Sequence, residues 1–136
     1  MTIATELDDL IIGDGNDNEI NGQGGNDTIL GGVGLDLING GSGNDTIAGG
    51  LDVDTVIGGA GDDIILISDG EFIDNVDGGT GFDSLILSPI VTPSEAVFID
   101  LSTNTFTGFG GTTTVTGIEQ VIGTQGADTL IGDGAD

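Results

Sequence analysis

The feature that most constrains the fold is a nine-residue repeat that runs without interruption from residue 22 to residue 66. Its five blocks read GQGGNDTIL, GGVGLDLIN, GGSGNDTIA, GGLDVDTVI and GGAGDDIIL. Each block begins with glycine, has an aspartate at its sixth position and an aliphatic residue at its eighth. Because side chains alternate faces along a strand, the eighth residue is predicted to point inward and the seventh and ninth outward. The glycine-rich residues ahead of them are predicted to form a six-residue turn.

These blocks resemble the nonapeptide G-G-x-G-x-D-x-U-x, with U aliphatic, of the RTX or haemolysin-type calcium-binding family. The resemblance implies an all-β fold, a right-handed parallel β-roll with calcium ions in its turns. Two nonapeptides make one coil, so successive blocks are expected to alternate between two parallel sheets.

The nine-residue register extends beyond the five regular blocks. Residues 13–21 have Asn18 in the aspartate position, and residues 4–12 keep Asp9 and an inward Ile11. Residues 67–77 lack the glycine pattern, and we interpret them as an irregular half-turn that still completes a coil. Residues 78–86 restore the motif with Asp83 in place.

Residues 87–122 are rich in Thr, Val, Ile and Phe and predict a longer-stranded insert. We expect strands near 96–101, 113–116 and 119–122, with turns at 102–105 and 108–111. The nonapeptide returns at 123–131 with Asp128 and Leu130 in position. The whole of 1–136 is predicted to be one module: regular repeats over 4–66, the half-turn 67–77, a repeat at 78–86, the extension 87–122 and the returning repeat 123–136. We expect it to be part of a longer repeat protein.

The two ends of the chain are similar to each other. Residues 122–136 match residues 3–17 at eight of fifteen positions, at an offset of 119 residues. Either any two blocks of such a repeat look alike, or the module belongs to an array with this longer period.

The aspartates are the predicted metal ligands. Calcium takes six to eight oxygen ligands from carboxylates and carbonyls, whereas magnesium requires a tighter octahedron and zinc prefers nitrogen and sulfur. Turns two blocks apart are expected to stack, which gives one row of Asp9, Asp27, Asp45, Asp63 and Asp83 and a second row of Asn18, Asp36 and Asp54. Asp128 is expected to bind as well. Backbone carbonyls are expected to contribute near Gly22, Gly24, Gly31, Gly32, Gly34, Gly40, Gly41, Gly43, Gly49, Gly58, Gly59, Gly61, Gly78, Gly79 and Gly81.

Two residues depart from the motif. Asn18 removes one carboxylate and is predicted to weaken its site. Asp52 replaces the fourth-position glycine of its block, which either strains the turn or adds a ligand.

Composition limits the possible partners. The chain has 24 acidic residues and no Lys, Arg or His, for a net charge of −24, so its field attracts cations and repels nucleic acid. It has no cysteine and no apolar run long enough to span a membrane. The expected partners are calcium ions, neighbouring modules of the same protein and, by end-to-end contact, other copies of the chain.

The first functional hypothesis is a calcium-binding module that folds when it meets calcium outside the cell. The resemblance implies export by a type I system and therefore a secreted or cell-surface location. The alternative is adhesion: outward aliphatic residues of one sheet dock a neighbouring module or a glycan within a large bacterial adhesin. Catalysis is not expected, because the chain has no His, Cys, Lys, Arg or Tyr and its aspartates occupy the metal positions.

Overall fold

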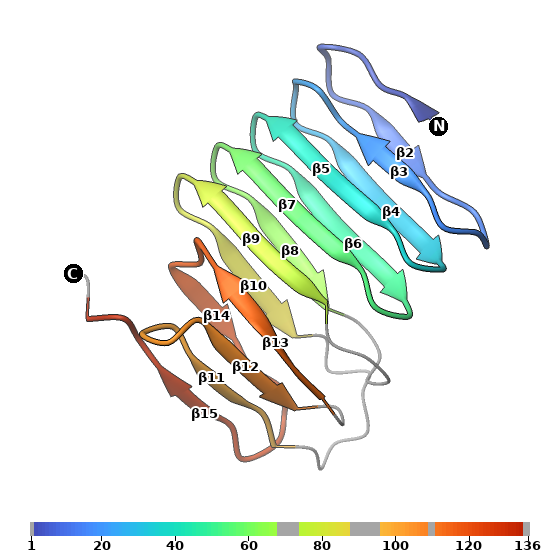
Figure 1. Ribbon diagram of the computed structural model, residues 1–136. Coiled ribbons are helices and arrows are strands. Elements are labelled where there is room, and N and C mark those ends of the chain that lie inside the picture. Colours follow the sequence, from blue (N-terminus) through green and yellow to red (C-terminus); the bar gives the residue numbers. More distant parts are fainter. Residues whose placement is uncertain (1, 68–73, 88–95, 109–110, 135–136) are drawn as a thin grey trace.

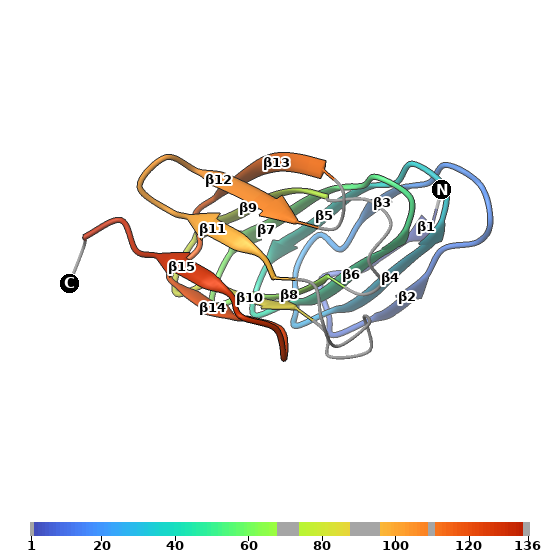
Figure 2. The ribbon, with the colours of Figure 1, turned by 90° about the horizontal axis from the view of Figure 1, so that it is seen from below.

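The computed structural model describes residues 2–67, 74–87, 96–108 and 111–134. These residues form strands and turns and no helix, and the strands lie in two layers stacked coil upon coil (Figure 1). Seen from below, the two layers face each other across a narrow interior (Figure 2). No helix in the described part of the chain is long and apolar enough to cross a membrane.

The larger sheet has the order β1-β3-β5-β7-β9-β13-β12-β11-β15, and the smaller has the order β14-β10-β8-β6-β4-β2. The strands are β1 (Thr2–Ile3), β2 (Leu10–Ile12), β3 (Glu19–Asn21), β4 (Thr28–Val33), β5 (Leu37–Ser42), β6 (Thr46–Leu51), β7 (Thr55–Ala60), β8 (Ile64–Ile67), β9 (Asn75–Thr80), β10 (Ser84–Leu87), β11 (Phe98–Asp100), β12 (Thr105–Gly108), β13 (Gly111–Thr116), β14 (Gln120–Ile122) and β15 (Thr129–Ile131).

The regular strands pair in parallel with the strand two further along the chain. Ile29 lies beside Ile47 in the smaller sheet, and Ile38 lies beside Val56 in the larger one. Each pairing spans two nonapeptides, so successive blocks alternate between the sheets. This confirms the predicted parallel β-roll.

The strands are longer than predicted. β4 takes the last three residues of one block and the first three of the next, and β5, β6 and β7 do the same. The predicted six-residue turn is therefore wrong, because the paired glycines continue the ladder, as at Gly41 beside Gly59. Gly41 has a φ of 112°, and a Cβ there would lie 2.3 Å from the carbonyl oxygen of Gln23, so no larger residue fits.

The core consists mainly of two files of aliphatic side chains from the eighth positions, one file on each sheet. Within a sheet, parallel pairing places the eighth-position residue of one coil directly above that of the next, and these side chains are buried. Those in the repeats up to residue 86 are at most 3% exposed: Ile11, Ile20, Ile29, Ile38, Ile47, Val56, Ile65, Val76 and Leu85. Phe106 and Ile99 continue this core into the insert.

The roll resumes in register after the irregular segment. β9 pairs with β7, with Val76 beside Val56, and β10 pairs with β8, with Leu85 beside Ile65. The offset is 20 residues rather than 18, so two extra residues are accommodated. Residues 68–73, where much of the predicted half-turn falls, lie outside the described residues.

The insert differs from the prediction in its strands. β11, β12 and β13 form an antiparallel meander that joins the larger sheet, and β14 joins the smaller sheet beside β10. Residues 101–104 form the first turn, and Thr105, placed in that turn by the sequence, begins the unpredicted strand β12. Phe106 explains the extra strand, because its fully buried ring needs an inward position. The predicted turn at 108–111 lies partly outside the described residues.

Candidate metal centre

The sixth-position aspartates lie at the ends of the turns, immediately before a strand begins. They form two rows, one along each edge of the roll, and each row runs parallel to the stack of coils. Along each row, the Oδ1 atom of one aspartate accepts a hydrogen bond from the backbone N–H of the row member one coil earlier. The N–H groups of Asp9, Asp27, Asp45 and Asp63 donate in this way along the first row, over 2.7–2.8 Å. The N–H groups of Asn18, Asp36 and Asp54 donate along the second, over 2.8–2.9 Å.

The second carboxylate oxygen is left without a partner. The Oδ2 atoms of six aspartates are buried and accept no hydrogen bond: Asp27, Asp36, Asp45, Asp54, Asp63 and Asp83. All six residues are at most 3% exposed. A buried carboxylate oxygen without a donor is costly, and the sequence has no Lys, Arg or His to supply one. A cation from outside the chain would therefore stabilise the ionised rows.

Five of the six unpartnered oxygens, those of Asp27, Asp36, Asp45, Asp63 and Asp83, lie beside a backbone carbonyl of the next coil. A Cβ built on Gly22 would lie 2.3 Å from Asp27 Oδ2 and 2.2 Å from the carbonyl oxygen of Gly40. A Cβ on Gly58 would lie 2.4 Å from both Asp63 Oδ2 and the carbonyl oxygen of Gly78. Two oxygens so near one point are close enough together to bind the same calcium ion, whose ligand distances are about 2.3–2.6 Å.

The electrostatics of the rows favour neutralisation. Burial, together with the neighbouring carboxylates of Asp74, Asp36 and Asp52, raises the pKa of Asp54 to about 7. Burial also raises the pKa of Asp63 and of Asp74 to about 6. The pKa values of Asp36, Asp45 and Asp83 are raised for the same reason. An ionised carboxylate in these positions is destabilised until a positive charge joins it.

The chemistry of the donors fits calcium. Among the described residues no three acidic side chains converge on one point, so an ion must take carbonyl oxygens as well as carboxylates. Calcium accepts such mixed oxygen sets, and water completes its shell. Zinc would find no histidine or cysteine ligand in this chain.

Comparison with protein families gives a match to the RTX calcium-binding nonapeptide repeat, in four copies, over residues 3–38, 30–65 and 113–136. The matched residues cover more than half of the chain. The chain belongs to the RTX calcium-binding repeat family. A comparison with curated proteins finds no match. RTX repeats are structural calcium-binding units rather than typical catalysts.

Not every predicted RTX ligand is in the same state. Asp9 and Asp128 stand at the sixth positions of blocks 4–12 and 123–131, but both are only partly buried. Asp9 Oδ2 accepts hydrogen bonds from the N–H and the hydroxyl of Thr5, at 2.7 and 2.9 Å. Asp128 Oδ2 accepts them from the N–H and the hydroxyl of Thr124, at 2.6 and 3.2 Å. Their role as ligands stays a prediction, and in both residues the Oδ2 atom that the six open carboxylates leave unpartnered is already hydrogen-bonded.

The side chain of Asn18 also forms hydrogen bonds within its own RTX block. Its Oδ1 accepts the N–H of Asp14 at 2.9 Å, and its Nδ2 donates to Asp14 Oδ1 at 3.2 Å. Asp52 has a φ of 78° and lies exposed, with Oδ2 accepting the N–H of Gly34 at 3.3 Å. Asp52 thus adopts a left-handed backbone conformation, and its carboxylate accepts a hydrogen bond from the neighbouring coil.

The rows contain two acidic residues that the sequence analysis missed. Asp74 is buried and extends the second row, since its Oδ1 accepts the N–H of Asp54. Glu119 extends the first row, since its Oε2 accepts the N–H of Asp83 at 2.7 Å. Both could have been found from their spacing to an inward residue. Each stands two residues before an inward valine, Val76 or Val121, just as the sixth residue of an RTX block stands two before the eighth.

Proposed function

We propose that the chain is a module that folds on binding calcium outside the cell, within a protein exported by a type I system. The calcium-binding character follows from the RTX family; the coupling of calcium to folding and the secretion route are the proposal. The observation that supports it best is the set of six buried, unpartnered Oδ2 atoms in a chain without cationic side chains.

The physical reason is that the core is thin and the turns repel one another. Two files of aliphatic side chains, one on each sheet, must offset the conformational entropy of the ordered chain, while stacked carboxylates oppose the fold. Binding free energy that exists only in the folded state then becomes folding free energy. Extracellular calcium modules bind at about 10⁻⁴–10⁻³ M, so the chain would stay unfolded where calcium is scarce and fold after export.

Circular dichroism of the isolated chain in a chelator, in calcium and in magnesium tests this proposal. We expect a largely disordered spectrum in chelator, a cooperative gain of β structure at millimolar calcium, and little change with magnesium at the same concentration. A β-rich, compact protein in the chelator would contradict the proposal.

A second, compatible function is docking through the outer face of the smaller sheet. One column of that face is aliphatic in every described strand, in ladder register: Ile12, Leu30, Ala48, Leu66, Ile86 and Ile122. The neighbouring outward column is Leu10, Thr28, Thr46, Ile64, Ser84 and Gln120, so the strands of this face present no acidic side chain although the chain has 24. The larger sheet, by contrast, presents Glu19 and Asp77 outward. An uncharged aliphatic face without aromatic rings suits another protein module better than a glycan.

Hydroxyl-radical footprinting of the longer parent protein and of the isolated module tests the docking function. If a neighbouring module covers the face, labelling of Leu30 and Ile122 falls in the parent protein while labelling of Leu37, on the larger sheet, is unchanged. Equal labelling of Leu30 in both samples would exclude docking through this face.

A further inference from the structure

The turn before β14 brings a buried carboxylate, a carbonyl and a second acidic side chain together at the end of the first row. Asp83 is fully buried, and its Oδ2 has no hydrogen-bond partner. A Cβ built on Gly78 would lie 2.8 Å from Asp83 Oδ2 and 1.9 Å from the carbonyl oxygen of Gly117. This is the arrangement seen at Gly22 and Gly58, but the carbonyl now comes from the insert.

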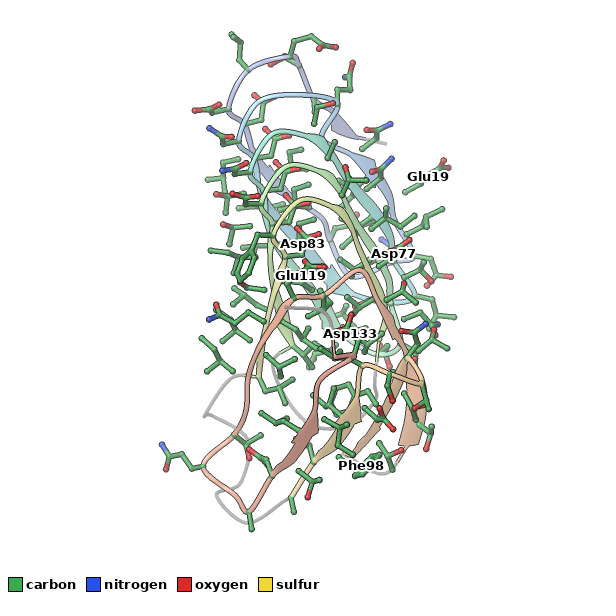
Figure 3. All side chains as sticks on the ribbon, turned by 90° about the vertical axis from the view of Figure 1, so that its left-hand side faces the viewer. Glu19, Asp77, Asp83, Phe98, Glu119 and Asp133 are labelled. Atoms are coloured by element: carbon green, nitrogen blue, oxygen red, sulfur yellow. The ribbon has the colours of Figure 1, made fainter. Side chains whose placement is uncertain are left out.

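Glu119 takes the place of the missing sixth-position aspartate. Its Oε2 accepts the N–H of Asp83, the bond that Asp83 Oδ1 makes to Asp63 one coil earlier. The strand after it keeps the register of the roll, with Val121 beside Leu85. Figure 3 shows Asp83 and Glu119 close together on the stacked turns that face the viewer.

β14 pairs with β10 over three residues, but the attachment of the insert to the larger sheet is shorter. β13 pairs with β9 only at Val115 beside Val76 and Thr116 beside Asp77. By comparison, β7 pairs with β9 from Thr55 to Ala60. The turn from β13 to β14 contains only Gly117, Ile118 and Glu119, and Gly117 has a φ of 59°. The inward residues Val115 and Val121 are six residues apart, against nine in the regular blocks, so this connection offers fewer carbonyls than a full RTX block, and Glu119 is exposed.

We propose that a calcium ion binds between the Asp83 turn and the Gly117–Glu119 turn and fastens the insert to the regular roll. Asp83 Oδ2, the carbonyl of Gly117 and the carboxylate of Glu119 are its protein ligands, and water supplies others. The inference rests on the proposed calcium function and adds to it a site that uses a glutamate outside the nonapeptide pattern. Because the site is more exposed and has fewer carbonyls, it binds more weakly than the inner sites.

Glu119→Gln isolates the ligand role from the structural one. Glutamine keeps a side-chain oxygen that accepts the N–H of Asp83, but it removes the charge that calcium needs. Glu119→Asp keeps the charge and serves as the conservative variant. Glu19→Gln makes the same chemical change at an exposed position of β3, on the side of the second row rather than the first, and serves as the matched control.

Calcium titration by calorimetry, combined with hydrogen exchange at saturating calcium, tests the proposal. For Glu119→Gln we expect the weakest site to be lost or at least about tenfold weaker, since calcium affinity follows the charge of the ligand set. Amides of β13 and β14 should then exchange faster, while β6 and β7 stay protected. Glu119→Asp should restore both readouts, and Glu19→Gln should change neither.

The outcomes separate the two claims. If the unmodified chain takes up no calcium, the proposed function itself fails. If the chain binds calcium but Glu119→Gln has the same isotherm and the same exchange of β13 and β14 as Glu19→Gln, the proposed function stands. The calcium site at Glu119 is then excluded.

Discussion

The inner and outer blocks of the roll carry the same sixth-position aspartate but use it differently. In the blocks of Asp27, Asp36, Asp45, Asp54, Asp63 and Asp83, the Oδ2 atom is buried and unpartnered. In the blocks of Asp9 and Asp128, a threonine at the second position donates both its N–H and its hydroxyl to that carboxylate.

The backbone of the second residue explains the difference. In all six open blocks this residue has a positive φ: Gln23, Gly32, Gly41, Gly50, Gly59 and Gly79. Thr5 and Thr124 do not have a positive φ, and their N–H groups point to the aspartate of their own block. Glycine reaches this backbone conformation without a steric cost, whereas threonine is β-branched and avoids it. The second residue thus decides whether the aspartate is available to an ion.

The largest effect is expected from Asp45→Asn, in the middle of the first row. It leaves an acceptor for the N–H of Asp27 but removes a charge that neighbouring ions share. We expect a loss of about 3–5 kcal/mol in the free energy of unfolding at saturating calcium, the usual scale for removing one partner of a buried charge pair.

Asp9→Asn is the matched control for that variant. Its carboxylate is closed by Thr5 and partly exposed, so we expect a loss of about 1 kcal/mol, the scale of one hydrogen bond. Urea unfolding in calcium measures both variants. Equal losses would show that open and closed carboxylates do not differ in function.

Gly58→Ala should come next in size. Its Cβ would occupy the space between Asp63 Oδ2 and the Gly78 carbonyl, 2.4 Å from each, and so separate two ligands of one ion. We expect one ion fewer in a calorimetric titration and about 1–3 kcal/mol lower stability from overpacking. Gly15→Ala, where a Cβ would meet nothing within 4 Å, should leave both quantities unchanged; an equal effect of the two substitutions would contradict the proposed ion position.

The buried aspartates of both rows should also make the metal-free protein sensitive to pH. Burial raises the pKa of Asp54 to about 7 and those of Asp63 and Asp74 to about 6, so the folded state holds more protons than the unfolded state between about pH 4 and pH 7. The associated stability is present below the unfolded pKa and is lost as the pH rises through 6 to 7.

We therefore expect the metal-free chain to gain β structure as the pH falls from 7.5 to 5, as measured by circular dichroism. Asp54→Asn should reduce this dependence, because it removes the group with the highest of these pKa values. A metal-free protein that loses structure over the same range would reverse the expected sign.

The smallest effect is expected where a closed block is opened. Thr5→Gly removes the hydroxyl that caps Asp9 Oδ2 and permits the positive φ of the open blocks. We expect one additional weak ion, filling at about millimolar calcium. Thr5→Ser keeps the hydroxyl donor and should bind the same number of ions as the unmodified chain. If calorimetry finds no extra ion for Thr5→Gly, the second residue does not control access.

Much of the fold could be predicted from the sequence, because a strict nine-residue period has one simple solution. Ile29, Ile38 and Ile47 stack inward only if two blocks make a coil, and that condition also places Asp27 and Asp45 in one row. The parallel roll, both rows and the choice of calcium followed from this pattern.

The remaining features depend on contacts that the pattern does not encode. β12 exists because Phe106 needs an inward position, and no period in the insert marks it. The closure of Asp9 by Thr5 depends on the φ of a single residue. Asp74 and Glu119 could have been found, since each precedes an inward valine by two residues, but the absent glycines concealed them.

Long-wavelength anomalous diffraction from crystals of the calcium-loaded chain tests the distinction between open and closed carboxylates most directly. We expect calcium peaks beside the Oδ2 atoms of Asp27, Asp36, Asp45, Asp54, Asp63 and Asp83, and none beside the Oδ2 atom of Asp9, which Thr5 caps. Rows without peaks at Asp45 and Asp63, or a peak of equal height bound to Asp9 Oδ2, would contradict it.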